Sequence, residues 1–142
     1  MTIPARLSIV TLGVSDLATS IAFYKALGWR RSTASNDGIS WFALTGSAIG
    51  LFPLAELAAD ANVPLGRGGF GGITLAINLE SEALVDSAIG TALAAGGTIT
   101  KAPVHTDWGG YSGYFADPDG YPWEVAFNPF FPLGDDGGLR LP

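Results

Sequence analysis

The chain has 142 residues, of which 48% are hydrophobic and 14% charged, and its formal net charge is −6. This length fits one domain or two tightly fused half-domains, and the composition supplies a core and excludes a disordered protein. Lysine and arginine form no cluster, which argues against nucleic acid or an anionic membrane surface as a partner, and the lack of cysteine excludes disulfides, thiolate catalysis and cysteine-based metal sites.

The first half of the chain has the pattern of one strand, one helix and a series of short strands. Residues 7–14 are rich in β-branched and apolar side chains, which predicts a strand with alternate residues on opposite faces. Ser15 or Asp16 can then cap a helix over 17–27, where apolar residues recur at helical spacing until Gly28. The remaining predicted elements of this half are strands at 29–34, 39–44 and 48–52 and a short helix at 54–60.

The second half repeats this order after a glycine-rich connector at 64–72. Ser81 caps a predicted helix that runs to about residue 95 and is closed by Gly96 and Gly97. The predicted strands of this half are 73–79, 98–101, 111–116 and 122–127. The last two are joined by Asp117-Pro118-Asp119-Gly120, which has proline and glycine at favoured positions of a turn.

These elements predict an α+β fold of two βαβββ halves with curved sheets. The halves span about 7–54 and 72–128 within a single domain of residues 1–142, and a tail follows at 129–142. Each helix is expected to cover the convex face of its sheet, so that the two concave faces oppose each other and form a cleft. Any binding site is expected in that cleft.

Two segments of the chain resemble those of a known superfamily. Residues 10–17, with Phe-Tyr at 23–24 and Leu-Gly-Trp at 27–29, are similar to the opening of vicinal-oxygen-chelate proteins, and 113–125 is similar to their closing hairpin. Segment 108–115 looks like that of a glyoxalase-like branch. The resemblance covers nearly the whole chain and implies the glyoxalase and bleomycin-resistance fold. It leaves the function open, because members include glyoxalases, extradiol dioxygenases, epimerases, fosfomycin-modifying enzymes and metal-free bleomycin-sequestering proteins.

The resemblance also implies where a metal would lie. Enzymes of the superfamily generally hold a divalent cation with His, Glu or Gln from the first and last strands of each half, and the metal acts as a Lewis acid. In this chain the first-strand positions carry Ile9 and Gly72, and 49–52 offers no such ligand. Glu124 alone is left, and the sole histidine, His105, falls on a predicted loop outside the expected positions. Since one carboxylate does not hold a divalent cation by itself, we predict no family-type metal and no cofactor.

Glu124 is the first candidate for chemistry. Its alternation with Trp123 and Val125 points it into the predicted cleft, where a buried carboxylate has a raised pKa and can act as an acid or a base. The alternative interpretation is a carboxylate that a neighbouring tyrosine, threonine or backbone amide merely satisfies. His105 with Asp107 is a second candidate for proton transfer, although a loop histidine near an aspartate is more typical of a solvated surface.

Aromatic and hydroxyl side chains are the other candidates for a ligand site. Aromatic walls bind flat or cationic organic molecules, although each ring taken singly also fits ordinary packing. Two threonines occupy matching inward-facing positions, and Trp108 stands in a polar, glycine-rich loop where packing explains it poorly. The expected ligand-binding residues are Thr11, Trp41, Phe52, Thr74, Trp108, Tyr111, Tyr114 and Glu124.

We expect a cytoplasmic homodimer that binds a small organic molecule without a metal. The first six residues lack the pattern of a signal peptide, and no apolar run approaches the ~18 residues that cross a bilayer. The stretch 127–133 is too apolar to lie bare in water, so it is buried either in a dimer or over its own subunit. The alternative function is a glyoxalase-type lyase or isomerase that uses Glu124 as acid or base. A third is a partner-binding protein with a vestigial cleft.

Overall fold

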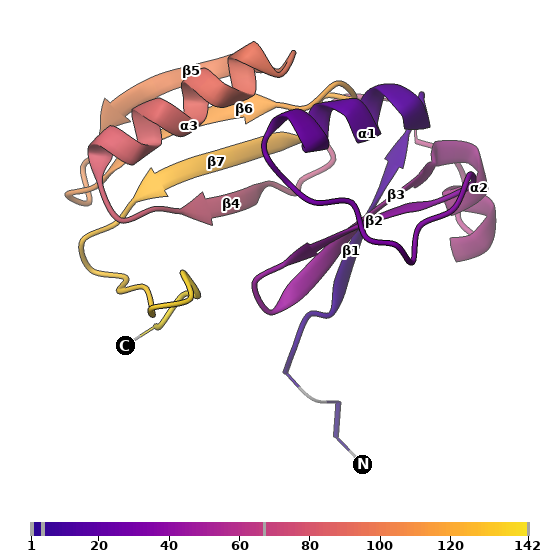
Figure 1. Cartoon of the computed structure of the whole chain (residues 1–142), viewed down its shortest axis with the longest axis horizontal. Coiled ribbons are helices and arrows are strands. Elements are labelled where there is room, and N and C mark those ends of the chain that lie inside the picture. The colour runs from indigo at the N-terminus through magenta and orange to yellow at the C-terminus, as the bar shows by residue number, and fades with distance from the viewer. Residues whose placement is uncertain (1, 4, 67, 142) are drawn as a thin grey trace.

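A computed structural model describes residues 2–3, 5–66 and 68–141, which fold into two sheets and three helices (Figure 1). In chain order the elements are β1 (Ile9–Val14), α1 (Leu17–Ala26), β2 (Ser40–Leu44), β3 (Ser47–Pro53), α2 (Leu54–Ala61), β4 (Leu75–Asn78), α3 (Glu82–Ala94), β5 (Thr98–His105), β6 (Tyr111–Ala116) and β7 (Pro122–Phe127). The first sheet, here called sheet A, has the order β1-β3-β2, and the second, sheet B, has the order β4-β7-β6-β5. The predicted α+β fold is therefore confirmed.

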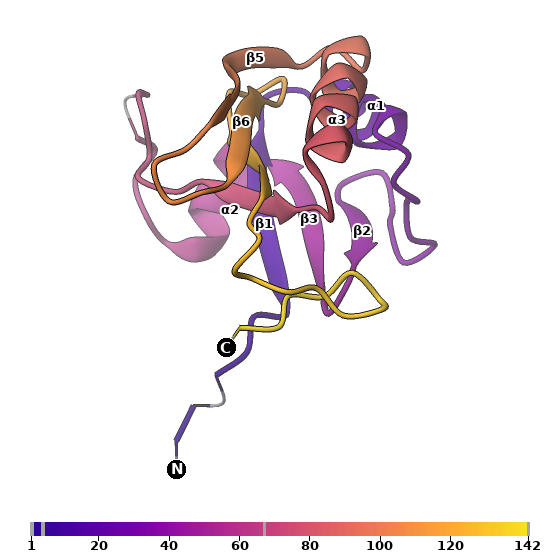
Figure 2. The ribbon, with the colours of Figure 1, turned by 90° about the vertical axis from the view of Figure 1, so that its left-hand side faces the viewer.

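The two long helices begin and end where their capping residues lie. The Asp16 carboxylate accepts hydrogen bonds from the backbone N–H groups of Ala18 and Thr19, at 3.1 and 3.3 Å, and the Ser81 hydroxyl accepts from the Leu84 N–H at 3.2 Å. Gly28 follows α1 with a φ of 93°, a conformation that glycine adopts easily. Figures 1 and 2 show α1 and α3 side by side on one side of the molecule.

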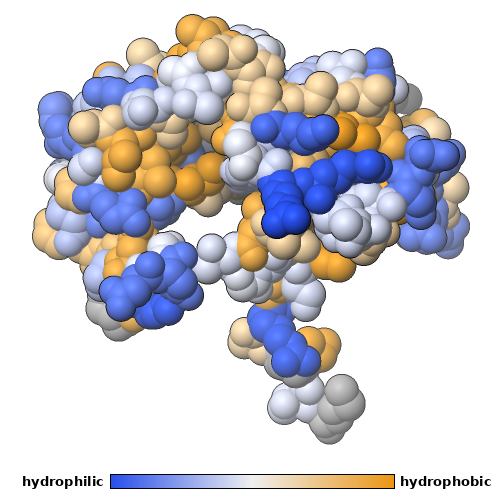
Figure 3. Space-filling model, viewed as in Figure 1, coloured by the Kyte–Doolittle hydropathy of each residue, from blue (hydrophilic) through white to orange (hydrophobic). Residues whose placement is uncertain are grey.

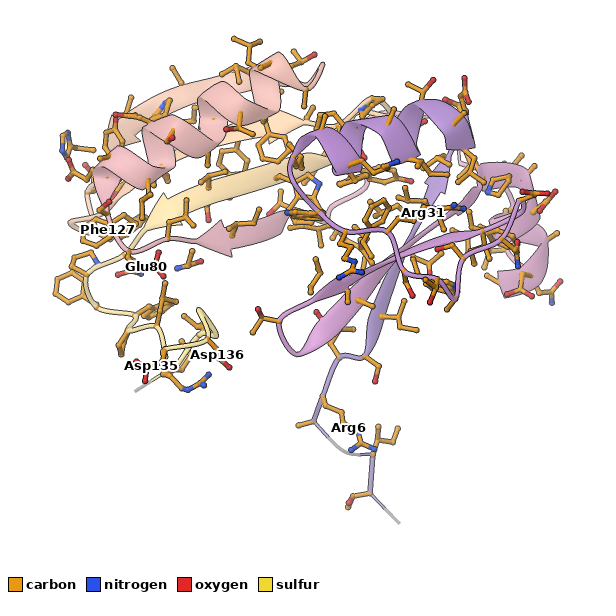
Figure 4. All side chains as sticks on the ribbon, viewed as in Figure 1. Arg6, Arg31, Glu80, Phe127, Asp135 and Asp136 are labelled. Carbon is orange, nitrogen blue, oxygen red and sulfur yellow. The ribbon has the colours of Figure 1, made fainter. Side chains whose placement is uncertain are left out.

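The predicted strand at 29–34 is wrong, and sheet A has three strands instead of four. Only Arg31 forms an isolated bridge, to Phe42 of β2. The Arg31 guanidinium donates to the Ser40 hydroxyl at 2.8 Å and to the Asn36 carbonyl at 2.9 Å, and so holds a turn where the pattern predicted continuous strand (Figure 4). The predicted strand 98–101 is too short, because β5 continues through two register irregularities as far as His105.

One hydrophobic core joins the two sheets through α1. Phe23 and Tyr24 of α1 are buried, and their rings contact Phe115 of β6 and Trp123 of β7, with ring centroids 6.2 Å apart in both pairs. Val85 of α3 belongs to the same core. α1 therefore lies at the junction of the two halves. On the face of sheet A turned away from α1, Leu54 of α2 packs against Gly13 at the end of β1.

A buried polar group ties this junction together. The Tyr24 hydroxyl donates to the Asp117 carboxylate at 2.7 Å and accepts a hydrogen bond from the Trp123 indole N–H at 3.2 Å. Asp117 also accepts from the backbone N–H groups of Asp119 and Tyr121, each at 2.9 Å. Burial raises the pKa of the Asp117 carboxyl, and these hydrogen bonds oppose that shift. Burial and the charge of Asp117 raise the pKa of Tyr24.

The turn after β6 makes further contacts with the first half. Asp119 accepts from the Ser15 backbone N–H at 2.8 Å and from the Ser20 hydroxyl at 3.1 Å. The Tyr121 hydroxyl donates to the Gly13 carbonyl at 2.7 Å. The turn predicted from its proline and glycine is therefore also the main polar contact between the halves.

The tail beyond β7 folds back on its own chain. Leu133 and Leu139 form an isolated bridge, and the Thr45 hydroxyl donates to the Asp136 carbonyl at 3.5 Å. Figure 1 shows the tail below β4 and beside the β2–β3 hairpin, and Figure 3 shows it as a largely hydrophilic lobe beside the body. Phe130 stays 64% exposed and Phe131 39%, so the tail covers its apolar residues only in part. No helix among the described residues is long and apolar enough to cross a membrane.

Candidate functional site

The face of sheet A that α1 leaves uncovered, here called open face A, carries three of the predicted residues. Ser40 and Phe42 of β2 are buried toward the helix, so Trp41 between them lies on the open face. Trp41 and Thr11 are both register partners of Gly50 on β3. Phe52, two residues further along β3, belongs to the same face. Sheet geometry therefore brings together an indole, a phenyl ring and a hydroxyl.

Gly50 explains how Trp41 lies on this face. A β-carbon at position 50 would stand 2.5 Å from a ring carbon of Trp41 and 3.3 Å from the Thr11 hydroxyl oxygen. The indole therefore lies across the strand at the place where glycine has no side chain. The sequence pattern gave no signal for this role, because a glycine within a strand is also compatible with a bulge or a bend.

The corresponding face of sheet B, here called open face B, carries Glu124 in its centre. Four residues lie in register across the four strands, namely Ala76 of β4, Glu124 of β7, Tyr114 of β6 and Lys101 of β5. Trp123 and Val125 are buried against the helix layer, as the alternation predicted. Glu124 is half-buried and so points away from the core, on the opposite side of the strand.

Glu124 and Tyr114 are register neighbours on adjacent strands. Partial burial raises the pKa of the Tyr114 phenol, and its interaction with the nearby Glu124 carboxylate raises that pKa further. The phenol therefore stays protonated and remains a donor. A carboxylate has about four acceptor positions, so this one keeps the capacity to accept from a ligand.

Tyr111 lies on the other face of sheet B, contrary to its predicted place beside Tyr114. Its hydroxyl donates to Asp86 of α3 at 2.8 Å, and its ring is 4.9 Å from that of His105. The sequence contained the signal for this, because Tyr111 and Tyr114 are three residues apart in one strand and must face opposite sides. We therefore leave Tyr111 out of the candidate site.

His105 is also remote from Glu124. It is the last residue of β5 instead of a loop residue, and its Nε2 lies 3.0 Å from a carboxylate oxygen of Glu82 on α3. Its partner is thus Glu82, where the sequence suggested Asp107. His105 and Glu82 are both exposed, so the structure offers this histidine no enclosed site for proton transfer.

The two remaining predicted ligand-binding residues, Thr74 and Trp108, lie outside the strands. Thr74 is exposed and stands one residue before β4. Trp108 is 45% exposed in the turn between β5 and β6, where its ring packs against Gly110. A larger residue at position 110 would overlap that ring, so the glycines of this turn accommodate the tryptophan.

Open faces A and B do not form one enclosed cleft within the described chain. The halves meet through α1 and the turn after β6, and two prominent cavities among the described residues have no predicted site residue in their lining. The larger cavity, of about 580 Å³, lies between the β2–β3 hairpin, β4 and the tail. The smaller, of about 310 Å³, is mostly apolar and lies beside α3. Sequence reasoning missed both, because loops and the tail complete them.

The donor set near Glu124 does not fit a divalent cation. Ile9 lies on open face A with an apolar side chain, and the register neighbours of Glu124 are Ala76 and Tyr114. Within the described residues no three His, Asp or Glu side chains lie close enough together to hold a metal ion. A family-type metal needs several preorganised ligands, which this donor set does not supply.

The chain belongs to the glyoxalase/bleomycin resistance protein/dioxygenase superfamily. The family model of that description matches residues 6–125. A glyoxalase-related enzyme from Fulvimarina pelagi is 33% identical, with a TM-score of 0.88, over 97% of this chain and 99% of that one. The resemblance seen in the two sequence segments is thereby confirmed.

Further solved structures share the fold at lower identity. A superfamily enzyme from Burkholderia phytofirmans PsJN is 23% identical, with a TM-score of 0.76, over 87% of this chain and 98% of that chain. A lactoylglutathione lyase from Agrobacterium tumefaciens is 25% identical, with a TM-score of 0.67, over 89% and 96%. The curated proteins gave no match.

Proposed function

We propose that the protein binds a small, flat organic molecule between open face A of one copy and open face B of a second copy in a homodimer. The observation that carries the proposal is the Glu124–Tyr114 pair, a carboxylate beside a protonated phenol on a sheet face that its own chain leaves uncovered. A polar pair in such a place is suited to fix the orientation of a ligand.

The two faces supply complementary halves of a site. Open face A offers the indole of Trp41, the ring of Phe52 and the Thr11 hydroxyl, which suit a flat apolar body. Open face B offers the Glu124 carboxylate, which suits a donor or a cationic group. The net charge of −6 also favours a neutral or cationic ligand over an anion at this carboxylate.

A second copy would cover surface that one copy leaves bare. β1 and β4 each pair with only one neighbouring strand, so each leaves a free edge. Ile9 on open face A is 47% exposed and Val104 near open face B is 44% exposed. Burying such residues against a partner is favourable, since apolar surface contributes roughly 25 cal/mol per Å² removed from water.

The second candidate function is a glyoxalase-type lyase or isomerase. The Glu124–Tyr114 pair favours it, because a carboxylate beside a protonated phenol can take a proton from a carbon next to a carbonyl group while the phenol donates to the developing oxyanion. Turnover of a 2-oxoaldehyde with a thiol, lost in Glu124→Gln, would establish this candidate. Binding without turnover would leave the first.

Calorimetry with 2-naphthylmethylamine, a flat aromatic cation, tests the binding site. We expect Glu124→Gln to weaken binding about tenfold or more, because a charge-assisted hydrogen bond is lost. Lys101→Gln is the control on the same face, and removing this neighbouring cation should not weaken binding. Equal affinities for the wild type and Glu124→Gln would contradict the proposal, and so would a monomer in sedimentation at micromolar concentration.

Mixing two variants tests whether two copies build the site. Trp41→Ala and Glu124→Gln each damage every cleft of their own homodimer. In a mixed dimer one cleft contains both defects and the other contains neither, so half of the sites of the mixed dimers should regain the wild-type affinity, while the remaining homodimers stay impaired. No recovery on mixing would place both residues in the site of one chain and refute the shared cleft.

The same calorimeter tests the metal prediction. Zinc, nickel and manganese titrated into the wild type and Glu124→Ala should give no stoichiometric binding, because Glu124 has no second protein ligand among its register neighbours. Tight one-to-one binding that disappears in Glu124→Ala would show that residues from the partner copy complete a metal site.

A further inference from the structure

The cavity of about 580 Å³ is bordered by Ala76 and Trp123 but not by Glu124 or Tyr114, and it has the features of a separate binding site. Its size falls within the range of about 300–1,000 Å³ that is usual for small-molecule pockets. The β2–β3 hairpin forms one side, β4 and Trp123 form another, and the tail hairpin closes it with Leu133 and Leu139. Segments from three parts of the chain thus enclose one space.

Two indoles make a rigid corner of this cavity. Trp29 and Trp123 both line it, and their rings meet edge to face with centroids 5.5 Å apart and planes at 75°. Trp29 also stacks on Tyr24 at 5.4 Å, while the Trp123 indole N–H is held by the Tyr24 hydroxyl. Because both rings are fixed by buried partners, a flat apolar molecule could pack on them without first ordering the wall.

The polar lining favours an anion. Arg30 is the one charged residue among the described residues of the lining, and no hydrogen bond or ion pair in the described structure engages its guanidinium. Asp136 of the tail hairpin pairs with Arg140 at 3.2 Å. Thr45, Ser47 and Asn78 add hydroxyl and amide donors to the same wall.

The tail hairpin forms an outer wall of the cavity. It is held together by the Gly134 N–H, which donates to the Gly138 carbonyl at 2.8 Å, and by the bridge between Leu133 and Leu139. The Thr45 hydroxyl of the β2–β3 turn donates to the Asp136 carbonyl of the hairpin at 3.5 Å, which is long for an O–H donor. Figure 4 shows Asp135 and Asp136 on this hairpin, below β4.

We propose that this cavity is a second ligand site, which binds a small monocarboxylate with a flat apolar body. The carboxylate pairs with Arg30, and the body packs in the corner of Trp29 and Trp123 under the tail hairpin. Its ligand has the opposite charge to the one proposed for Glu124, so the two sites are distinguishable by the charge of the probe.

Calorimetry with 2-naphthoate tests the site, with 2-naphthylmethanol as the neutral analogue. Arg30→Gln should weaken 2-naphthoate binding about tenfold or more and leave 2-naphthylmethanol nearly unchanged. Lys101→Gln, which removes a cation from open face B, should leave both unchanged. Arg30 and Thr45 are exposed, so variants at these positions should fold, and circular dichroism checks this.

Thr45→Trp places a large ring at the mouth of the cavity and should abolish binding of both probes there. The proposal is overturned if Arg30→Gln binds 2-naphthoate as the wild type does, or if Glu124→Gln, not Arg30→Gln, weakens it. It is also overturned if Thr45→Trp converts a dimer into a monomer, because a second copy then occupies the cavity. Failure of the amine to bind at Glu124 leaves this test unaffected.

Discussion

Replacing Tyr24 by phenylalanine removes one hydroxyl from the buried junction of the two halves. That hydroxyl donates to the Asp117 carboxylate at 2.7 Å and accepts from the Trp123 indole N–H at 3.2 Å. Loss of a hydrogen bond to a charged group costs about 1.5–3 kcal/mol, and an orphaned buried donor costs about 1–3 kcal/mol. Because the two losses overlap, we expect a destabilisation of about 3 kcal/mol and a fall in Tm of about 10 °C.

The pH dependence follows from the carboxyl group. Burial raises the pKa of Asp117 in the folded state above its unfolded value, so folding favours the protonated carboxyl. This contribution to the free energy of unfolding is present at low pH and is lost as the pH rises through the folded pKa. Tyr24→Phe removes a donor that lowers this pKa, so the variant should lose most stability at neutral pH and less in acid.

Thermal unfolding from pH 3 to pH 8 measures this effect, with Tyr111→Phe as the matched control. Tyr111 donates to Asp86 at 2.8 Å, almost the same distance, but on an exposed surface. We expect little or no measurable change there, because water replaces the lost partner. Equal losses in the two variants would refute the argument from burial.

Three further substitutions test the strand and helix geometry. Gly50→Ala should displace the Trp41 indole, shift its fluorescence and weaken 2-naphthylmethylamine binding, because the new β-carbon would stand 2.5 Å from the ring. Gly90 of α3 is the control, because it is exposed and a β-carbon there has no atom within 4 Å. Gly90→Ala should therefore stabilise the fold by about 1 kcal/mol. Asp16→Ala should lower the Tm at neutral pH, since its side chain caps α1. Hydrogen bonds from Thr19 lower the pKa of Asp16. The stabilising effect of this carboxylate is therefore present above the unfolded pKa near 3.8 and is lost as the pH falls through the folded pKa. A Tm difference between the wild type and Asp16→Ala that persists at pH 2 would contradict this.

Local patterns predicted the regular elements well wherever the hydrophobic periodicity and the capping or turn residues indicated the same element. β6 and β7 occupy the predicted residues 111–116 and 122–127, and α3 covers all but the last residue of the predicted helix. The segment 29–34 was mispredicted because its β-forming residues are held by tertiary contacts of Arg31, which no local pattern contains.

The candidate site was less predictable, since it depends on register and on contacts between distant segments. Alternation placed Glu124 away from the core, and the same rule applied to β6 would have separated Tyr111 from Tyr114. The corner of Trp29 and Trp123 had no sequence signal, because these residues are 94 positions apart (123 − 29) and meet only through the core.

The junction between the halves also constrains how the chain is made. Tyr24 and Asp117 are 93 residues apart, and Gly13 and Tyr121 are 108 apart. During synthesis the first half therefore emerges from the ribosome before Phe115, Asp117 and Trp123, which cover Phe23 and Tyr24 in the folded chain. The full burial of these two residues requires β6, the turn after it and β7. Packing of α1 is thus completed only when almost the whole chain has been made. Nascent chains that end before residue 117 expose part of the apolar face of this helix to chaperones and proteases.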